Sequence, residues 1–599
     1  MRLILKSKVG IAVLLLILSF ILYGNTIKGE PVYDDQLFFY RQDLRKLSSV
    51  GNLLVERYLP DNRMLNVYRP LLTMSFAFNF IFGDSPVSFH LTNIILHALA
   101  SFLVFVLGLK LFARFDFAVL SSLIFVILPI HSEAVASIKA RDDIFLAIFS
   151  ILTLLMFVKV MDAKNTIKYY FLGSFFFFLA LLSKEFGVIL PLVISGVSYM
   201  GLKVKASAIL KKIHFFVTPM VIYMILRYKA LGSFLYNRED VYFIINPLGY
   251  LDFFKRISTA FKIAFIYISK SFVPYSLSAT YHYNQVKIIT NPFTDIEAVA
   301  GMILLLTGLY FVVSKKWKNT PLGIGSFTFL SSYIIFSKFI FKQGDTAAER
   351  WLYLPTIGIS FILAHLLLKI KDKKILFIIL LLSLLTTYGW VLIGRNRVWR
   401  SRESLYKSMI LSAPRSAQGY ISWAQFNFDN QNTKEAKKYA EMGYGIYQNH
   451  PPLLNLMGEI AMEEGSYKKA YEYFVKTIKI NPKYTPAYSN LALLFYKTKD
   501  YDNSIKLLDK LVSNNDLRTE KNVELYARAL TKKELYQKSN EVIVKYLTEN
   551  TNRKSAKLIL ALNHYKLGDY NKAISYIDWP LDISYDQKIK VLDGLIDLE

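Results

Sequence analysis

Apolar runs long enough to cross a lipid bilayer recur through the first two thirds of this 599-residue chain. The hydrocarbon core of a bilayer is about 30 Å thick and needs roughly 20 residues of helix. Eleven segments approach that length, and they lie at 9–23, 88–109, 116–131, 143–161, 169–183, 186–202, 213–232, 293–313, 320–341, 355–370 and 375–394. The sequence therefore predicts an all-α fold that begins with a polytopic bundle of about eleven membrane spans.

The distribution of Lys and Arg predicts which loops face the cytoplasm. Short basic loops such as 203–212 and 369–374 share the side of the N-terminus, which the positive-inside rule places in the cytoplasm. The segment 250–274 is apolar but contains four cations, so we expect an amphipathic helix on the outer surface. The long outer loops are then 24–87, 233–292 and 342–354, with shorter ones at 131–142 and 184–185. A twelfth span at 250–274 would instead place everything after Arg395 in the cytoplasm.

Charge and cysteine content exclude several classes of function. Of the net charge of +27, residues 401–599 contribute only +5, from 29 Lys and Arg against 24 Asp and Glu. The remainder belongs to the apolar half, where contact with lipid phosphates explains it and no nucleic-acid partner is needed. The chain has no Cys, which excludes disulfides, thiolate metal sites and cysteine nucleophiles. Abundant Ile, Lys, Asn and Tyr without Cys favour a bacterial inner membrane.

A 34-residue period replaces the apolar runs in the C-terminal region. Small residues recur at intervals of 34 or 35 residues, which is the tetratricopeptide period, at Ala436, Ala470, Ser504, Ser539 and Ala573. We therefore divide the chain into a membrane module, 1–400, and an α-solenoid of about five repeats, 401–599. Such arrays bind peptides or protein partners, so the period alone names no function.

An acidic pair, Asp34-Asp35, follows the first apolar run, and other outer loops also concentrate charge. Carboxylates at this place either cap the next helix or act in catalysis. The remaining charged or titratable candidates on the predicted outer loops are Arg69, His131, Glu133, Arg141, Asp142, Asp143, Lys184, Glu185, Glu349 and Arg350. A membrane bundle with paired carboxylates and guanidinium groups on one face is suited to hold a charged ligand.

An ordered set of motifs resembles one family. The motifs are Tyr33-Asp34-Asp35, Tyr68-Arg69-Pro70-Leu71, Phe89-His90-Leu91-Thr92-Asn93 with His97, Pro129-Ile130-His131-Ser132-Glu133, Arg141-Asp142-Asp143, Ser183-Lys184-Glu185, Ala348-Glu349-Arg350-Trp351, and Arg395-Asn396-Arg397 with Trp399. Followed by the repeats, this set resembles the transmembrane and tetratricopeptide-repeat O-mannosyltransferases and their bacterial relatives.

The resemblance implies a GT-C fold and an inverting glycosyltransferase that uses a polyprenyl-phosphate-linked sugar. It places the active site on the lumenal or periplasmic side and an essential acid in the first outer loop, here Asp35 or Asp34, with Asp35 preferred. A hydroxyl acceptor needs a carboxylate to take its proton, while a phosphate leaving group needs cations. We expect Arg350 to hold the phosphate, with Arg141, Lys184 and Arg69 in support.

Other roles for these residues stay open at this stage. His131 and Glu133 with Asp142 and Asp143 could bind Mg²⁺ or Mn²⁺, although their spacing matches no recognised metal site. Glu349 is a further supporting candidate. His90 and His97 lie two helical turns apart, and we expect hydrogen bonds between helices from them rather than metal binding.

The leading hypothesis is a membrane glycosyltransferase that moves a sugar, with mannose as the first candidate, to a hydroxyl on a protein or glycan outside the cytoplasm. The repeats would hold the acceptor or a protein partner. The alternatives are transfer to a lipid or surface polysaccharide, and a non-catalytic membrane-tethered scaffold for envelope assembly. The sequence does not identify the sugar, the carrier length, the acceptor or the oligomeric state.

Overall fold

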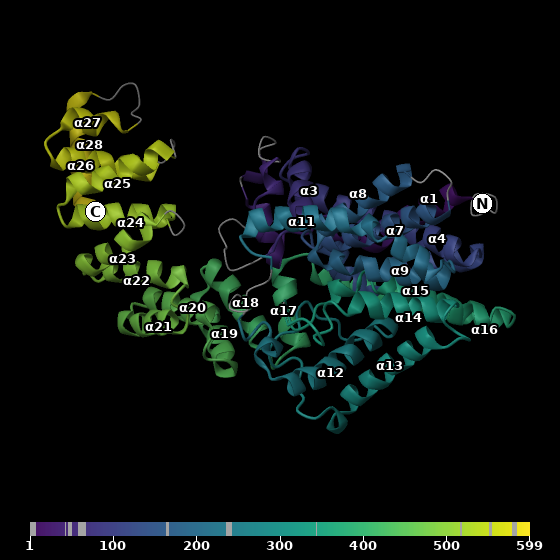
Figure 1. Ribbon diagram of the computed structural model, residues 1–599. Helices are drawn as coiled ribbons and strands as arrows, with labels where there is room; N and C mark the ends of the chain where they lie inside the picture. Colours follow the sequence, from purple (N-terminus) through teal and green to yellow (C-terminus); the bar gives the residue numbers. More distant parts are fainter. Residues whose placement is uncertain are drawn as a thin grey trace. The chain divides into compact units, whose positions relative to one another are not determined.

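The computed structural model describes residues 7–41, 43–45, 51–57, 67–162, 167–234, 242–342, 344–514, 518–549, 554–577 and 584–598. The chain divides into two compact units, Met1–Trp423 and Ala424–Glu599, which we describe separately (Figure 1). The predicted all-α class is confirmed, because the described residues form helices and only an isolated bridge, between Tyr281 and Ala347, has β geometry. Parts of the predicted outer loops 24–87 and 233–292 lie outside the described residues.

The first unit is a bundle of helices of very different lengths. Its helices are α1 (Lys8–Tyr23), α2 (Gln36–Phe39), α3 (Pro70–Phe80), α4 (Pro86–Phe112), α5 (Phe115–Ile127), α6 (Ser132–Ala136), α7 (Arg141–Asp162), α8 (Ile167–Ser183), α9 (Leu190–Gly201), α10 (Ala206–Lys211), α11 (His214–Leu231), α12 (Phe253–Phe272), α13 (Ile296–Val313), α14 (Pro321–Tyr333), α15 (Thr356–Lys369), α16 (Lys374–Val398) and α17 (Arg402–Ser412). α18 (Ala417–Asp429) crosses the boundary between the units.

Each of the eleven predicted spans contains a helix, but fewer are long enough to cross a membrane alone. Among the described residues, five helical segments are long and apolar enough, or six if the bent pair Phe115–Ile127 and Pro129–Ala136 is one span. The five are Lys8–Thr26, Pro86–Phe112, Arg141–Met161, Ile296–Val313 and Lys374–Val398. Ile167–Ser183, Glu185–Gly201 and Thr356–Lys369 are apolar but shorter. The count of eleven therefore stays a prediction.

Close helix contacts and a large apolar core hold this unit together. At the contact of α14 with α15, a Cβ on Gly358 would lie 2.2 Å from the carbonyl oxygen of Gly325, so only glycine permits this approach. Around it, aromatic and aliphatic residues of α1, α4, α5, α7, α8 and α15 form one continuous buried cluster. The polar side chains described below therefore project from rigid elements.

The predicted amphipathic segment 250–274 forms α12, which is not among the helices long and apolar enough to span a membrane. α12 packs against α13. Its Arg256 is buried and donates to the backbone oxygens of Lys338 at 2.6 Å and Phe339 at 2.9 Å. Its Lys270, near the other end, is also buried. The polar face of α12 is thus occupied by contacts within the protein.

The second unit consists of helix pairs that follow the 34-residue period. Its helices are α19 (Thr433–Ile446), α20 (Pro451–Glu463), α21 (Tyr467–Ile480), α22 (Thr485–Lys497), α23 (Tyr501–Ser513), α24 (Glu520–Lys532), α25 (Tyr536–Glu549), α26 (Lys554–Lys566), α27 (Tyr570–Ser575) and α28 (Tyr585–Leu598). Successive helices pack on one another as in an α-solenoid (Figure 1). The repeat prediction is confirmed.

The small residues at the repeat positions lie where two helices meet. All five are fully buried: Ala436, Ala470, Ser504, Ser539 and Ala573. Ser504 donates to the carbonyl oxygen of Ala492 at 2.9 Å, and Ser539 makes the equivalent bond to Ala527 at 3.0 Å. A side chain of two or fewer heavy atoms is therefore required at each of these positions.

Candidate functional site

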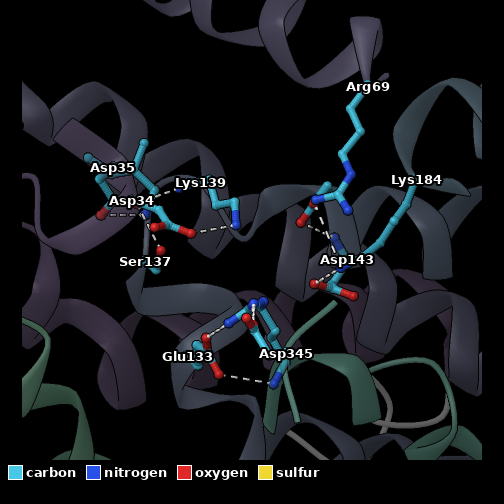
Figure 2. A network of polar contacts seen from close by, with 12 residues as sticks. Asp34, Asp35, Arg69, Glu133, Ser137, Lys139, Asp143, Lys184 and Asp345 are labelled. Atoms are coloured by element: carbon cyan, nitrogen blue, oxygen red, sulfur yellow. Dashed lines mark hydrogen bonds and ion pairs between the residues drawn. The ribbon is translucent and has the colours of Figure 1, made fainter. Parts of the chain in front are cut away.

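The acidic pair lies on a 3-10 turn, η3 (Tyr33–Asp35), directly before α2. Tyr33 has φ +51°, a left-handed conformation that is costly for an aromatic residue and is often found at functional sites. The Asp34 side chain is 37% exposed, and its Oδ2 lies 2.8 Å from Lys139 Nζ. Its Oδ1 accepts no hydrogen bond from any residue that the structure describes. Asp34 thus presents a free carboxylate oxygen (Figure 2).

Asp35 has the opposite environment. Its side chain is completely buried and accepts from Ser137 Oγ and the backbone N–H of Lys139, both at 2.8 Å, and from the backbone N–H groups of Ile138 and Val32. Burial outweighs these hydrogen bonds and raises the pKa of Asp35 to about 6. Asp35 therefore joins the η3 turn to the segment that carries Lys139 through hydrogen bonds. The geometry thus favours Asp34 as the reactive acid, whereas the sequence favoured Asp35.

Arg350, on the 3-10 turn η12 (Glu349–Leu352), connects two other carboxylates to this place. Its guanidinium pairs with Glu133 of α6 and, at 2.7 Å, with Asp345, while its backbone N–H donates to Glu133 at 3.1 Å. Although burial opposes the shift, the charges of Glu133, Asp345 and Asp34 raise the pKa of Arg350. Arg350 is therefore a permanent cation near Asp34, but its guanidinium is already paired on two sides.

A second network joins the start of α7 to the turn between α8 and α9. Lys184 Nζ lies 2.5 Å from Asp143 and 3.7 Å from Asp142, and all three side chains are buried. Arg69, the residue before α3, pairs with Asp142 at 2.6 Å and with Glu185 at 2.5 Å. These two predicted phosphate-binding cations are thus neutralised by three carboxylates, and they join α3, α7 and η8 (Glu185–Ile189) at one end of the bundle (Figure 2).

Arg141 lies outside both networks. Its fully buried guanidinium donates to the side-chain oxygens of Asn93 at 2.7 Å, Asn79 at 2.6 Å and Ser75 at 3.0 Å, and to the backbone oxygen of Phe89. These bonds hold α3, α4 and the start of α7 together. The predicted contact of Arg141 with a phosphate would require these bonds to break.

The histidines take part in hydrogen bonds between helices. His97 contacts the Val126 carbonyl of α5 at 3.2 Å, as expected of a bond between helices, and also the Tyr353 hydroxyl at 2.6 Å, whereas His90 contacts the carbonyl of Gly29, which lies in the loop after α1. His131 contacts Thr356 Oγ1 at 2.7 Å. Within the described ranges no group of three or more His, Asp or Glu could hold a metal ion. The predicted set of His131, Glu133, Asp142 and Asp143 is therefore not brought together as a metal site, and metal dependence stays a prediction.

Three residues outside the predicted site set belong to the cluster around Arg350. Lys139 pairs with Asp34, and Asp345 pairs with Arg350 and lies 3.8 Å from His282. Although burial opposes it, the nearby His282 side chain and the charge of Arg350 lower the pKa of Asp345. Both Lys139 and Asp345 lie on predicted outer loops, and this position was the only feature of the sequence that could have identified them as site residues. Glu349, by contrast, accepts from Tyr281 and from the Ser278 backbone.

Both units of the chain are similar in sequence to known proteins. Residues 72–228 match the family described as dolichyl-phosphate-mannose-protein mannosyltransferase, and residues 461–520 match the tetratricopeptide repeat. Human protein O-mannosyl-transferase TMTC1 is 23% identical over 77% of this chain and 58% of its own length. Human protein O-mannosyl-transferase TMTC3 is 23% identical over 92% of this chain and 65% of its own length. The chain is a relative of the protein O-mannosyl-transferases.

The resemblance to these O-mannosyl-transferases extends across both units. Protein O-mannosyl-transferase F38B6.6 of Caenorhabditis elegans is 25% identical over 71% of this chain and 61% of its own length. The chain thus spans less than two thirds of the length of each of these relatives. The matched region 72–228 contains Glu133, Lys139 and Lys184, whereas Asp34 and Arg350 lie outside it. The apolar helices and these relatives together indicate an integral membrane protein.

Proposed function

We propose that this chain is an integral membrane glycosyltransferase that transfers mannose from a polyprenyl-phosphate carrier to a hydroxyl group of a protein or glycan outside the cytoplasm. The observation that carries the proposal is the free, half-exposed carboxylate of Asp34 beside Lys139, in a chain related to protein O-mannosyl-transferases. The active site is on the outer side of a bacterial inner membrane, and the repeats hold the acceptor or a partner there.

The transfer needs one base and one leaving group. The acceptor oxygen forms a bond to the anomeric carbon of the sugar, the bond from that carbon to the phosphate oxygen breaks, and its electron pair stays on the polyprenyl phosphate. The acceptor proton passes to Asp34. Its Oδ2 accepts a hydrogen bond from Lys139, whereas its Oδ1 accepts none from the residues that the structure describes. Displacement in one step inverts the anomeric centre.

Asp35 and Arg350 keep this base in place. Asp35 holds the Val32 backbone and the 137–139 segment at once, so it fixes the distance between Asp34 and Lys139. Arg350 adds positive charge and connects Asp345 and Glu133 to the same region. A carboxylate held in a preorganised site needs no rearrangement during the reaction.

The substitution Asp34→Asn tests the base. In membranes that contain the full chain and a polyprenyl-phosphate-linked mannose, we expect transfer to a hydroxyl acceptor to fall by about 10²- to 10⁴-fold, with little change in KM for the sugar donor. Asp43→Asn is the matched control, because Asp43 lies in the same loop, is 42% exposed and is paired with Arg41. Equal transfer by wild type and Asp34→Asn would overturn Asp34 as the base.

Addition of EDTA to the same assay tests the predicted dependence on Mg²⁺ or Mn²⁺.

The side of the membrane is tested separately. A reporter that is active only outside the cytoplasm, fused after Glu599, should be active if the repeats share the side of the site. Activity of a cytoplasm-only reporter at the same position would contradict the proposal, because the repeats could not then meet an outer acceptor.

A further inference from the structure

Four cations were expected to hold the phosphate of the sugar donor, and all four already have partners. Arg350 pairs with Glu133 and Asp345, Arg69 with Asp142 and Glu185, and Lys184 with Asp142 and Asp143. Arg141 donates to neutral oxygens throughout. A phosphate that binds to any of them must compete with an existing partner. Another cation of the same unit has two unpaired nitrogens among the residues that the structure describes.

Arg395, near the end of α16, is that cation. Its side chain is more than nine-tenths buried, yet its Nε and Nη2 have no hydrogen-bond partner among the described residues. Its Nη1 makes one long contact, 3.4 Å, with Ser408 Oγ. The next residue, Asn396, binds Ser132 at 2.7 Å and the Leu22 carbonyl at 3.0 Å, so the end of α16 is fixed in position. A buried guanidinium with two unpaired nitrogens normally has an anion or water to satisfy it.

The charged groups around Arg395 leave an excess of positive charge. Lys270 Nζ lies 5.4 Å from the centroid of the Tyr281 ring, and the Tyr281 hydroxyl donates to Glu349 at 2.6 Å. Burial lowers the pKa of Lys270, the Glu349 carboxylate opposes this shift, and the Arg395 charge adds to it. Glu349 is not in ion-pair contact with either cation; it accepts from Tyr281 Oη and the Ser278 N–H. Burial also raises the pKa of Glu349 despite Arg395 and Lys270. Lys270 Nζ already donates to the carbonyl oxygens of Tyr275, at 3.1 Å, and Ser276, so Arg395 is the cation of this group that has unpaired donors.

We propose that Arg395, with Lys270 beside it, is the phosphate-binding site for the lipid-linked sugar donor. This inference rests on the proposed function and identifies the cation that holds the leaving group. The planar guanidinium can donate from Nε and Nη2 to two phosphate oxygens at once, which Lys270 cannot do alone.

The position of Arg395 favours a lipid-linked phosphate over a free one. α16 is long and apolar enough to cross a membrane, and only 17% of its apolar window is buried in the protein. Its exposed apolar residues include Ile379, Leu382 and Trp390, so one face of the helix that carries Arg395 is open to hydrocarbon chains, while Arg395 lies at the end of the buried face. A phosphate with a polyprenyl tail can contact both, whereas inorganic phosphate can contact only the cations.

The site also adjoins the segment of the proposed base. Trp399, one helical turn after Arg395, is buried against Val32, and its ring centroid lies 5.9 Å from the Arg395 guanidinium carbon. Val32 precedes the Tyr33–Asp35 turn, and Glu349 precedes Arg350. The leaving phosphate and the base would thus be held by neighbouring segments of one unit.

Binding of polyprenyl phosphate without a sugar tests the site without requiring transfer. We would measure its binding to the purified full chain in nanodiscs, with Arg395→Gln and Lys270→Gln as test variants. Arg397→Gln is the matched control, because Arg397 lies two residues further along α16 and is exposed. We expect Arg395→Gln to weaken binding by about thirtyfold or more and Lys270→Gln by less. Arg397→Gln should bind as wild type.

The outcomes separate this inference from the proposed function. If wild type binds the lipid and Arg395→Gln binds equally well, the inference is overturned, whether or not wild type transfers mannose. Undiminished binding in Lys270→Gln alone would remove only Lys270 from the site. If wild type neither binds the lipid nor consumes the sugar donor, both proposals fail. If inorganic phosphate competes with the lipid at an equal concentration, the site binds free phosphate, and the inference is also overturned. A thermal melt of each variant identifies any variant that does not fold.

Discussion

The first unit, Met1–Trp423, which we call the membrane unit, and the second, Ala424–Glu599, which we call the repeat unit, differ in how deeply their ion pairs are buried. In the membrane unit, Lys184, Asp142 and Asp143 form ion pairs with side chains that are 1 to 3% exposed. In the repeat unit the comparable pair, Lys437 with Glu464, is 45% and 35% exposed. The buried repeat positions carry Ala or Ser instead.

This difference follows from the cost of an isolated charge. A buried ion without a partner costs several kcal/mol, whereas a surface ion remains hydrated after its partner is removed. In the membrane unit the groups proposed for catalysis are therefore tied to the groups that hold the bundle together. In the repeat unit stability depends on the space between helices, and ion pairs such as Lys437 with Glu464 are exposed to solvent.

The largest effect on stability is expected for Lys184→Met. This change leaves Asp143 buried without its cation, and we expect a loss of about 3 to 5 kcal/mol, seen as a lower Tm of the purified chain in detergent. The double variant Lys184→Met, Asp143→Leu removes both charges and should regain much of the loss. A double variant no more stable than Lys184→Met would contradict the account of this network as a charge pair.

A smaller effect concerns Asp35 and pH. The pKa of its carboxyl is raised from 3.8 to about 6 in the folded chain, so the folded state holds the proton more tightly than the unfolded state. The stability gained at low pH is then lost as pH rises from 4 to 7, by about 3 kcal/mol. We expect the Tm of wild type to fall relative to that of Asp35→Asn over this interval. A constant difference in Tm would show that the carboxyl does not titrate there.

The sequence predicted the helices better than the interactions at their ends. Hydropathy located helical segments in all eleven predicted spans, and the 34-residue period located the repeat helices, because both signals repeat along the chain. It did not predict that the helix in the span 320–341 would end at Tyr333, as α14 does, since hydropathy does not show where a helix ends inside a packed bundle.

The candidate site shows the same limit at the level of single residues. The loops of Asp34, Glu133 and Arg350 were predicted together, and the structure brings them together. Which residue pairs with which depends on contacts between segments far apart in sequence, such as Asp34 with Lys139 or Arg350 with Glu133. The sequence therefore favoured Asp35 without any sign that this side chain is buried and that the side chain of Asp34 is 37% exposed. The free guanidinium of Arg395 could not be distinguished from paired arginines.

The repeat unit should respond to volume rather than to charge. Ala470 is fully buried in α21, and Gly458 of α20 lies so close that a Cβ there would be 2.4 Å from the Phe474 ring. We expect Ala470→Leu to destabilise by about 1 to 3 kcal/mol, with faster amide hydrogen exchange confined to residues 451–513. Lys469→Leu, at the exposed neighbouring position, is the control and should leave exchange unchanged.

The smallest effect is expected for Lys437→Gln, and it is the direct counterpart of the Lys184 variant. Lys437 Nζ lies 2.9 Å from both carboxylate oxygens of Glu464, a better geometry than many surface pairs have. Both groups nevertheless reach water, so the variant should lose no more than about 1 kcal/mol, and 1 M salt should reduce the difference from wild type. Added salt should change the effect of the buried Lys184→Met variant far less. An effect of Lys437→Gln as large as that of Lys184→Met would mean that the contrast between the units is not one of burial, and that the repeat unit also depends on its charges for stability.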